Sequence, residues 1–217
     1  MGAVVSVSQQ APDAATIARA ASELRAGGVL VVPTDSVYGL ACAATPGNPA
    51  HDRIFQIKRR DRAQTLPWFV ADLSDLDVYG ADVPAWAHRL AAAHWPGALT
   101  LVVRASAAVP PEYAQPGAAG APATIALRVP GSELCRALVR AVGAPLAQTS
   151  ANTHGAPAAT SGAGLDPSIV AAADLTLDAG PAPVGEASTI VDATGAAPRV
   201  LRAGALGEAA VLLAARA

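Results

Sequence analysis

The segment VLVVPTDSVYGL, Val29–Leu40, gives the strongest indication of the fold: a buried strand followed by a polar loop. Its first four residues are a continuous apolar run rich in β-branched side chains, which is typical of a strand covered on both faces. Pro33 lacks an amide donor and ends that strand. A Gly-Gly pair just before it closes a predicted helix over Asp13–Arg25. The polar loop Thr34–Leu40 therefore leaves a buried strand end, where α/β sheets place their ligand sites.

Helices and strands alternate along the rest of the chain. Further helices are expected at Pro49–Ile57, Pro84–His94, Glu133–Val142 and from Glu208 onward. Strands are expected at Pro67–Val70, Ala98–Val103, Thr124–Val129, Pro145–Gln148, Ser188–Asp192 and Arg199–Arg202. Irregular connections are expected at 105–123, which is rich in Ala, Pro and Gly, and at 149–166, which is rich in Ser, Thr, Gly and Pro. The pattern predicts an α/β fold, in which one domain holds a twisted, mixed or mostly antiparallel sheet with flanking helices.

The composition excludes several classes of protein. The 217 residues are 52% hydrophobic, but 55 of them are alanine. No stretch approaches the run of about 18 apolar residues that crosses a membrane. A formal net charge of −2 argues against a nucleic-acid backbone as the main partner. Neither the two cysteines nor the four histidines show a metal-binding spacing, so we expect no protein-ligated structural metal and two reduced, buried thiols.

The first ten residues hold neither Lys nor Arg and no apolar segment, so they predict no signal peptide. We therefore expect a cytoplasmic protein.

Lys58 is the single lysine among 15 basic residues. A compact ammonium in an arginine-rich background suggests a position that a guanidinium does not fit. Lys58 begins the run Lys-Arg-Arg-Asp-Arg, which puts four cations at the end of a predicted helix. A chance surface lysine, a solvated basic face and a cradle for a triphosphate all stay open from these residues alone.

Polar residues at strand ends and two arginines are further candidates. Thr34–Leu40 and Thr149–Asn152 offer short polar side chains that bind a ligand or simply satisfy a turn. Arg128 interrupts an apolar strand, so it pairs with a carboxylate of the fold or of a ligand, and Arg202 poses the same choice. A Ser/His hydrolase is disfavoured because the chain lacks a G-x-S-x-G elbow. Without a Walker A loop or a GxGxxG fingerprint, any nucleotide must be held by dispersed side chains.

Seven motifs, taken in order, resemble those of the YrdC-type threonylcarbamoyl-AMP synthases. They are Val32–Leu40, Lys58–Arg60, Trp95–Thr100, Thr124–Arg128 with Pro130, Thr149–Asn152, Ser188–Asp192 and Leu201–Gly204. Each motif alone is weak, but their order and spacing match over about residues 12–206. The resemblance implies a YrdC-like catalytic domain over 12–206, with an N-terminal extension over 1–11 and a C-terminal helix over 207–217.

The resemblance also implies a deep cationic cavity and a reaction. L-Threonine, bicarbonate or CO2, and ATP would give threonylcarbamoyl-AMP and pyrophosphate, for N6-threonylcarbamoyladenosine modification of tRNA. Mg²⁺ is expected with the triphosphate, and downstream tRNA-modifying transferase proteins are the expected partners; direct tRNA binding is left open. By motif position, Lys58 and Arg60 are the expected catalytic residues. The implied ATP side comprises Lys58, Arg60, Gln64, Thr124, Ser150, Asn152 and Arg202, and the implied threonine side comprises Thr34, Arg128 and Ser188.

Two alternatives stay open, one of them because of departures from the family pattern. Asp61 and Thr65 stand where the family usually has proline, and Ser36 replaces a common threonine. The K-x-R-D variant resembles YciO-type relatives, so a relative with a different substrate is one alternative. An RNA-binding module of the same fold is the other, although the acidic charge and the 4% aromatic content count against it.

Overall fold

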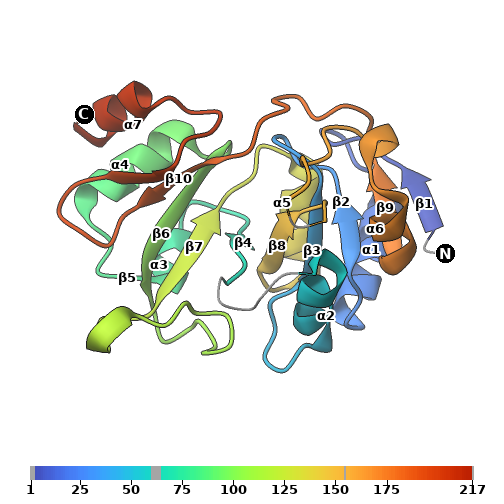
Figure 1. Ribbon diagram of the computed structural model, residues 1–217, viewed down its shortest axis with the longest axis horizontal. Coiled ribbons are helices and arrows are strands. Elements are labelled where there is room, and N and C mark those ends of the chain that lie inside the picture. The colour runs from blue at the N-terminus through green and yellow to red at the C-terminus, as the bar shows by residue number, and fades with distance from the viewer. Residues whose placement is uncertain (1–2, 60–64, 154, 217) are drawn as a thin grey trace.

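The computed structural model describes residues 3–59, 65–153 and 155–216. These residues form a mixed sheet of eleven strands with helices packed on both of its faces (Figure 1). The strands are β1 (Ala3–Ser6), β2 (Leu30–Val32), β3 (Gly39–Ala43), β4 (Trp68–Phe69), β5 (Gly80–Ala81), β6 (Leu99–Ala105), β7 (Thr124–Arg128), β8 (Leu146–Ser150), β9 (Leu175–Asp178), β10 (Thr189–Asp192) and β11 (Arg199–Arg202).

The helices are α1 (Ala14–Arg25), α2 (Pro49–Lys58), α3 (Asp75–Tyr79), α4 (Ala85–His94), α5 (Glu133–Val142), α6 (Pro167–Ala172) and α7 (Glu208–Arg216), with short 3₁₀ turns at Ala118–Gly120 and Gly162–Gly164. Within the described ranges, no helix combines the length and the apolar character that a membrane span requires.

The strand order is β1-β9-β2-β3-β8-β4-β7-β6-β10-β11, with β5 beside β6. The pairs β1/β9, β2/β9, β4/β7 and β6/β10 are parallel, and the other neighbours are antiparallel. The short strand β4 pairs with β8 on one side and with β7 on the other. It therefore joins two groups of strands: the β8 group, which is β1, β9, β2, β3 and β8, and the β7 group, which is β7, β6, β10 and β11 with β5. Figure 1 shows α1, α2, α5 and α6 beside the β8 group and α3, α4 and α7 beside the β7 group.

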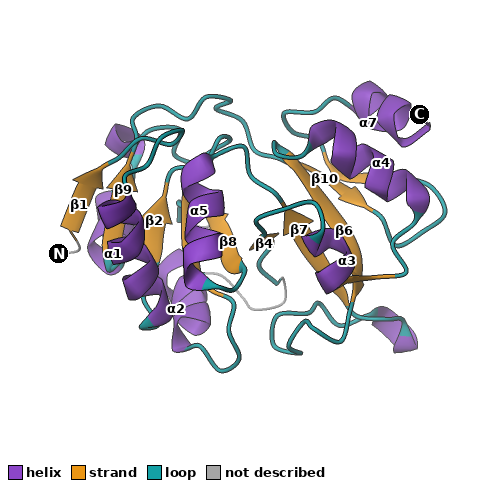
Figure 2. Cartoon of the chain, turned by 180° about the vertical axis from the view of Figure 1, so that it is seen from behind, coloured by secondary structure: helices purple, strands orange, loops and turns teal. Residues whose placement is uncertain are grey.

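Strand β2 is buried on both faces, as its apolar run predicts. Val31 packs in the same core cluster as Ile54 of α2 and Ile169 of α6. Leu30 and Val32 point the other way and pack with residues of α1 and α5, the two helices that cover the sheet in Figure 2. Burial on both faces explains why every position of this strand carries a branched aliphatic side chain.

Local sequence explains where several helices begin and end. The Asp13 carboxylate accepts a hydrogen bond from the Thr16 amide at 2.8 Å and caps α1. Ser132 caps α5 through the Cys135 amide. Gly143 ends α5 in the left-handed conformation, with φ of 78°, which glycine adopts without strain.

The predicted helices and strands are confirmed to within a few residues at their ends, but short elements are added. β1, β3, α3, β5, α6 and β9 are not indicated by the sequence pattern. β3 corrects the expectation that Thr34–Leu40 is a loop throughout, because Gly39 and Leu40 already pair with β2. Its residues, Gly-Leu-Ala-Cys-Ala, show neither alternation nor β-branched side chains, so its neighbours β2 and β8 determine the strand.

The first described residues, as β1, pair with β9 at one edge of the sheet. At the other end of the chain, α7 packs against α4, where the Arg89 guanidinium donates to the carbonyl of Ala215 at 2.8 Å. Both cysteines are free and buried, as expected, and burial raises the pKa of each thiol to about 12.

Candidate functional site

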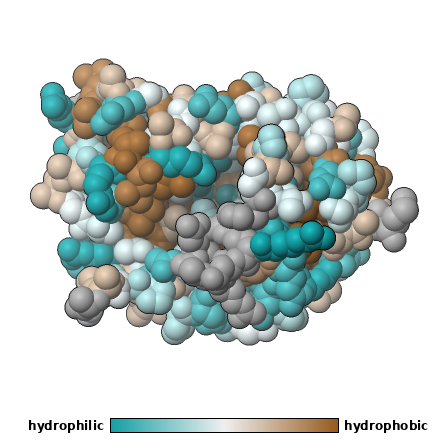
Figure 3. All heavy atoms as spheres, in the orientation of Figure 1, coloured by the Kyte–Doolittle hydropathy of each residue, from teal (hydrophilic) through white to brown (hydrophobic). Residues whose placement is uncertain are grey.

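A cavity of about 710 Å³ lies between the two groups of strands. Figure 3 shows the surface hollowed near the middle of the face that Figure 1 presents. The lining residues are Thr34, Ser36, Val37, Thr65, Pro67, Thr100, Val102, Gln115, Thr124, Ala126, Arg128, Gln148, Thr149, Ser150, Ala158, Ala187, Ser188, Ile190, Asp192, Thr194, Arg199, Leu201 and Arg202.

The floor of the cavity is one face of the β6–β7–β10 sheet. Because side chains alternate across a strand, Thr124, Ala126 and Arg128 of β7 point into the cavity. The residues between them, Ile125 and Leu127, point into the core on the opposite face. Thr100 and Val102 of β6 and Ile190 and Asp192 of β10 lie in phase with this pattern. The core packing of one face thus fixes which residues the other face offers to a ligand.

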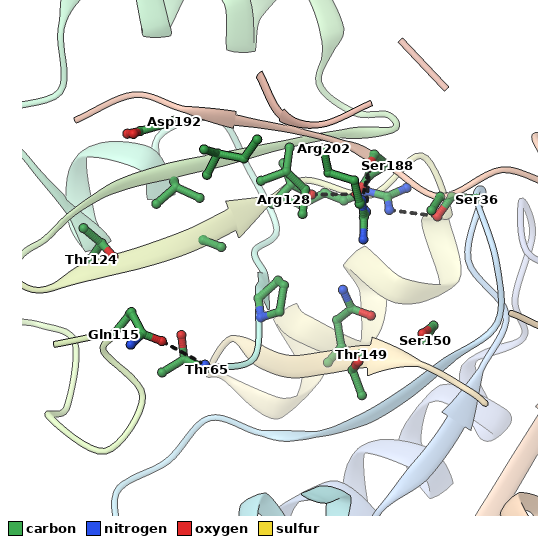
Figure 4. A pocket seen from close by; sticks show the side chains of 18 of the residues that line it. Ser36, Thr65, Gln115, Thr124, Arg128, Thr149, Ser150, Ser188, Asp192 and Arg202 are labelled. Carbon is green, nitrogen blue, oxygen red and sulfur yellow. Dashed lines mark hydrogen bonds between the residues drawn. The ribbon is translucent and has the colours of Figure 1, made fainter. Parts of the chain in front are cut away.

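Arg128 stands at one end of the cavity, where Figure 4 shows it with Arg202, Ser188 and Ser36. It is only 2% exposed, and its Nε donates to the carbonyl of Gly97 at 2.9 Å. One terminal nitrogen donates to the Ser36 hydroxyl at 2.8 Å, and the other donates to the Asp35 carboxylate at 2.7 Å. The guanidinium also lies 5.5 Å from the centre of the Phe69 ring.

The Asp35 contact answers the choice that the sequence left open for Arg128, because the guanidinium pairs with a carboxylate of the fold. The two side chains form an ion pair at 2.7 Å with exposed fractions of 3% and 10%. The strand places Arg128 in the wall, and the loop after β2 supplies the partner that a buried guanidinium requires. Its three hydrogen bonds to the fold leave two of its five N–H groups for other acceptors.

Arg202 and Ser188 form the neighbouring part of this end. The Arg202 guanidinium donates to the Ser188 carbonyl at 2.6 Å and to its hydroxyl at 3.2 Å. The Ser188 hydroxyl also shares a hydrogen bond of 2.9 Å with the hydroxyl of buried Thr100. Arg202 is partly exposed to solvent, but the desolvation of its half-covered guanidinium, and then the nearby charge of Arg128, lower its pKa from the ordinary value. The two guanidinium groups therefore repel each other at a place where an anion would be stabilised.

Thr34 serves the local turn and also lines the cavity. Its hydroxyl donates to the Val37 carbonyl at 2.7 Å and accepts from the amides of Ser36 and Val37 at 3.1 and 3.2 Å. These bonds are those of the turn expected from the sequence. The residue is 1% exposed and lies in the cavity wall beside Ser36.

Lys58 is 3% exposed, which excludes a chance surface lysine. From the end of α2 its ammonium donates to the Ser150 carbonyl at 2.6 Å, and to the carbonyl and side-chain oxygens of Asn152 at 2.8 and 2.9 Å. The Ser150 hydroxyl in turn donates to the Asn152 side-chain oxygen. Lys58 itself is not among the described residues that line the cavity, whereas Ser150 is. The ammonium therefore fixes the turn after β8 from behind the cavity wall.

The opposite end of the cavity carries Thr124, Gln115, Thr65 and Asp192 (Figure 4). The Gln115 side chain accepts from the Thr65 amide at 3.2 Å. Burial alone would raise the pKa of Asp192, but hydrogen bonds from Thr194 and the charge of Arg199 hold it below its ordinary value. Arg199 donates to this carboxylate at 2.6 Å. In the described part of the chain, no group of three His, Cys, Asp or Glu side chains is arranged to hold a metal.

Six of the residues assigned by motif position line this one cavity: Thr34, Thr124, Arg128, Ser150, Ser188 and Arg202. Asn152 does not line the cavity, but its side-chain oxygen accepts hydrogen bonds from Lys58 and from Ser150, which does. Arg60 and Gln64, like the departure at Asp61, lie outside the described residues. The residue-by-residue assignment to ATP and threonine stays a prediction.

Several lining residues were not among the candidates that the sequence indicated. Thr100 and Asp192 stand at strand positions in phase with Thr124 and Arg128, and that alternation could have indicated them. Gln115 belongs to the irregular connection and reaches the site through an isolated bridge with Thr124, so no local signal marks it. Asp35 lies within a recognised motif, but only the structure shows that it meets Arg128.

Comparison with known proteins gives consistent matches. The family model Sua5_yciO_yrdC, described as telomere recombination, matches residues 22–204. Threonylcarbamoyl-AMP synthase from Pyrococcus abyssi is 34% identical over 86% of this chain and 53% of its own length. The chain thus spans about half the length of this curated relative.

Two solved structures extend the comparison. The crystal structure of P. abyssi Sua5 complexed with L-threonine superposes with a TM-score of 0.82 at 32% identity, covering 93% of this chain and 57% of that one. The structure of E. coli YciO superposes with a TM-score of 0.83 at 29% identity, covering 98% of this chain and 100% of that one.

Proposed function

The chain belongs to the Sua5/YciO/YrdC family, and we propose on that premise that it is a threonylcarbamoyl-AMP synthase. It would join L-threonine, bicarbonate or CO2, and ATP into threonylcarbamoyl-AMP and release pyrophosphate. The main support is the arrangement at one end of the cavity. There Arg128 donates to the Ser36 hydroxyl and Arg202 donates to the Ser188 hydroxyl. Two guanidinium groups beside hydroxyls suit an amino-acid carboxylate and its neighbouring polar groups.

We assign threonine to this end. Its carboxylate would accept from the N–H groups that Arg128 and Arg202 have left, and Ser188 and Thr34 would supply hydroxyls to its other polar atoms. Support comes from the similarity to P. abyssi Sua5, whose solved complex contains L-threonine. The net positive lining at this end also favours the deep cationic cavity that the family resemblance implies.

We assign ATP to the residues around the end of β8 and to Thr124. Lys58 would act from behind the wall: it holds Ser150 and Asn152 in place and puts a positive charge close to the phosphates. Arg202 lies between the two assignments and would meet both the threonine and the nucleotide. The roles of Arg60 and Gln64 rest on their motif positions. Mg²⁺ would enter with the triphosphate, and Asp192 is the one carboxylate among the described lining residues.

The reaction asks mainly for positioning and charge. The threonine amine captures CO2 as a carbamate, and a carbamate oxygen then attacks the α-phosphorus of ATP, forming a P–O bond as the bond to pyrophosphate breaks. Arg128 orients the amino acid, while Arg202 and Lys58 stabilise the charge that develops on the phosphate oxygens. Arg128 and Lys58 are buried and already hydrogen-bonded, and Arg202 is held by Ser188, so these side chains need little reorganisation during the reaction.

A second candidate function is that of a YciO-type relative with a different substrate. It is favoured by the match to E. coli YciO, which covers the full length of that chain. Under this alternative the Arg128–Arg202 end of the cavity would still bind a carboxylate. The amino acid would have a different side chain, or the product would be passed to a different acceptor.

Product formation separates the two candidates. The purified full chain is incubated with ATP, bicarbonate and labelled threonine, and nucleotide products are separated by chromatography. We expect a threonine-labelled adenylate and an equal amount of pyrophosphate, both dependent on bicarbonate. Pyrophosphate release with another amino acid but not with threonine would support the YciO-type function. Absence of product with every amino acid tested would contradict both. A synthase would pass its product to a downstream tRNA-modifying transferase.

A further inference from the structure

We propose that Asp35 is a positioning residue that holds the Arg128 guanidinium and balances its charge, so that this end of the cavity accepts one carboxylate. The proposal rests on the proposed function for the identity of that carboxylate as threonine's. The geometry that carries it is independent of the reaction. Asp35 is not among the described lining residues, so it acts through Arg128 and not by touching the ligand.

The Asp35 side chain is only 10% exposed, so its surroundings leave it little room to move. One oxygen accepts from Arg128 at 2.7 Å. The other lies close to Gly131, where a Cβ atom added to the glycine would come within 3.0 Å of it, so glycine leaves just enough room for the carboxylate. The Asp35 backbone carbonyl accepts from the Val184 amide at 2.9 Å, which ties the same residue to the segment leading into β10. A side chain held in this way restricts Arg128 to one orientation.

Arg128 is enclosed in matching fashion. Its three donated bonds point to Gly97, Ser36 and Asp35, and the Phe69 ring lies close to the guanidinium. The remaining N–H groups are left for the cavity. Because guanidinium geometry is planar and rigid, fixing three of its bonds fixes the direction of the other two.

The charges at this end add up to one net positive. Arg128 and Arg202 each contribute a positive charge, and Asp35 contributes one negative charge. One ligand carboxylate would bring this sum to zero before the nucleotide, with its own charge near Arg202, binds. Without Asp35 the two guanidinium groups would form an uncompensated pair, which small inorganic anions would occupy.

Two variants separate charge from position. Asp35→Asn keeps the shape and removes the charge, so sulfate should become a competitive inhibitor against threonine, with an inhibition constant about tenfold lower than in the parent. Asp35→Glu keeps the charge and shifts the carboxylate, so the threonine KM should rise about tenfold without new sulfate inhibition. The ATP KM should stay within about twofold in both variants. Both substitutions leave the backbone bond to Val184 in place.

Asp174→Asn is the matched control, because Asp174 pairs with Arg53 at 2.8 Å away from the cavity. This control should keep the parent threonine KM and sulfate response, even where it lowers the melting temperature. Unchanged sulfate inhibition in folded Asp35→Asn would overturn the charge-balancing role. An unchanged threonine KM in Asp35→Glu would overturn the positioning role and can be measured even if Asp35→Asn does not fold.

A measurement without turnover separates this inference from the proposed function. Added sulfate should raise the melting temperature of Asp35→Asn by several degrees more than that of the parent. If the parent makes no threonylcarbamoyl-AMP, the proposed function fails, while the sulfate-dependent shift still judges Asp35. An equal sulfate-dependent shift in parent and variant would count against the inference even in an active synthase.

Discussion

Arg128 and Lys58 are both buried cations, but they stand on opposite sides of the cavity wall. Arg128 lines the cavity, pairs with the Asp35 carboxylate and keeps two N–H groups for a ligand. Lys58 lies behind Ser150 and directs its ammonium at backbone and amide oxygens of the turn after β8. We therefore propose different roles for the two motif residues: Arg128 would present charge to the ligand, and Lys58 would hold the wall that the ligand meets.

Removing the charge of Arg128 should have the largest effect. Arg128→Met would leave the Asp35 carboxylate buried without its partner, which costs about 3 to 5 kcal/mol of unfolding free energy. Urea denaturation of the parent and the variant measures it. The double variant Arg128→Met/Asp35→Asn should recover part of the loss. A change below about 1 kcal/mol in the single variant would show that the ion pair does not hold this end of the site.

Lys58→Met should lower both stability and activity. The substitution leaves the oxygens of Ser150 and Asn152 without their charged donor, a loss of about 1.5 to 3 kcal/mol of unfolding free energy. The ATP KM should rise more than the threonine KM. Arg53→Met, at a half-exposed ion pair on the same helix, is the control and should cost less than about 1 kcal/mol. Full stability together with lost activity would instead fit an ammonium that serves only the triphosphate.

Ser188→Ala should have a moderate effect confined to one substrate. The hydroxyl bonds to Thr100 and Arg202, so its loss should reduce kcat/KM for threonine by an amount equivalent to about 0.5 to 1.5 kcal/mol. The ATP KM should not change. Steady-state kinetics with each substrate varied gives both values, and Ser106→Ala, whose hydroxyl bonds to Val78 away from the cavity, is the control. A similar rise in the KM values for both substrates would show that Ser188 stabilises the fold and does not serve threonine alone.

Arg199→Ala should have the smallest effect, and that effect should depend on pH. Arg199 is 73% exposed, so its pair with Asp192 is worth at most about 1 kcal/mol. The pKa of Asp192 is lowered in the fold, so the stability it contributes is present above its unfolded pKa and is lost as the pH falls through its folded pKa. Melting curves of parent and variant should differ slightly at neutral pH and converge in acid. A difference that persists at pH 2 would contradict this origin.

The fold could be predicted where one short segment carried its own signal. β2 is buried on both faces, and its own apolar residues Leu30, Val31 and Val32 are enough to predict the strand. β3 does not, because Gly-Leu-Ala-Cys-Ala becomes a strand only between β2 and β8. Small residues have weak strand preference, so their structure depends on partners far away in the sequence.

The site divides in the same way. The motifs predicted Thr124, Arg128, Ser188 and Arg202 as site residues, and all four line one cavity. They do so because side chains in phase on neighbouring strands lie on the same face of the sheet. The partner of Arg128 could not be predicted, because 93 residues separate it from Asp35 and any of 17 acidic residues could have met it. Contacts between distant segments are properties of the packed chain.

We propose above all that the Arg128–Arg202 end of the cavity receives the carboxylate of the amino acid. Calorimetric titration of the full chain with L-threonine and with L-threoninamide tests it most directly, because the amide keeps the side chain and the amine but lacks the negative charge. We expect measurable binding of threonine and an affinity for threoninamide at least about a hundredfold weaker, because the amide cannot form charge-assisted bonds to the two guanidinium groups. Equal affinities for the two compounds would contradict it.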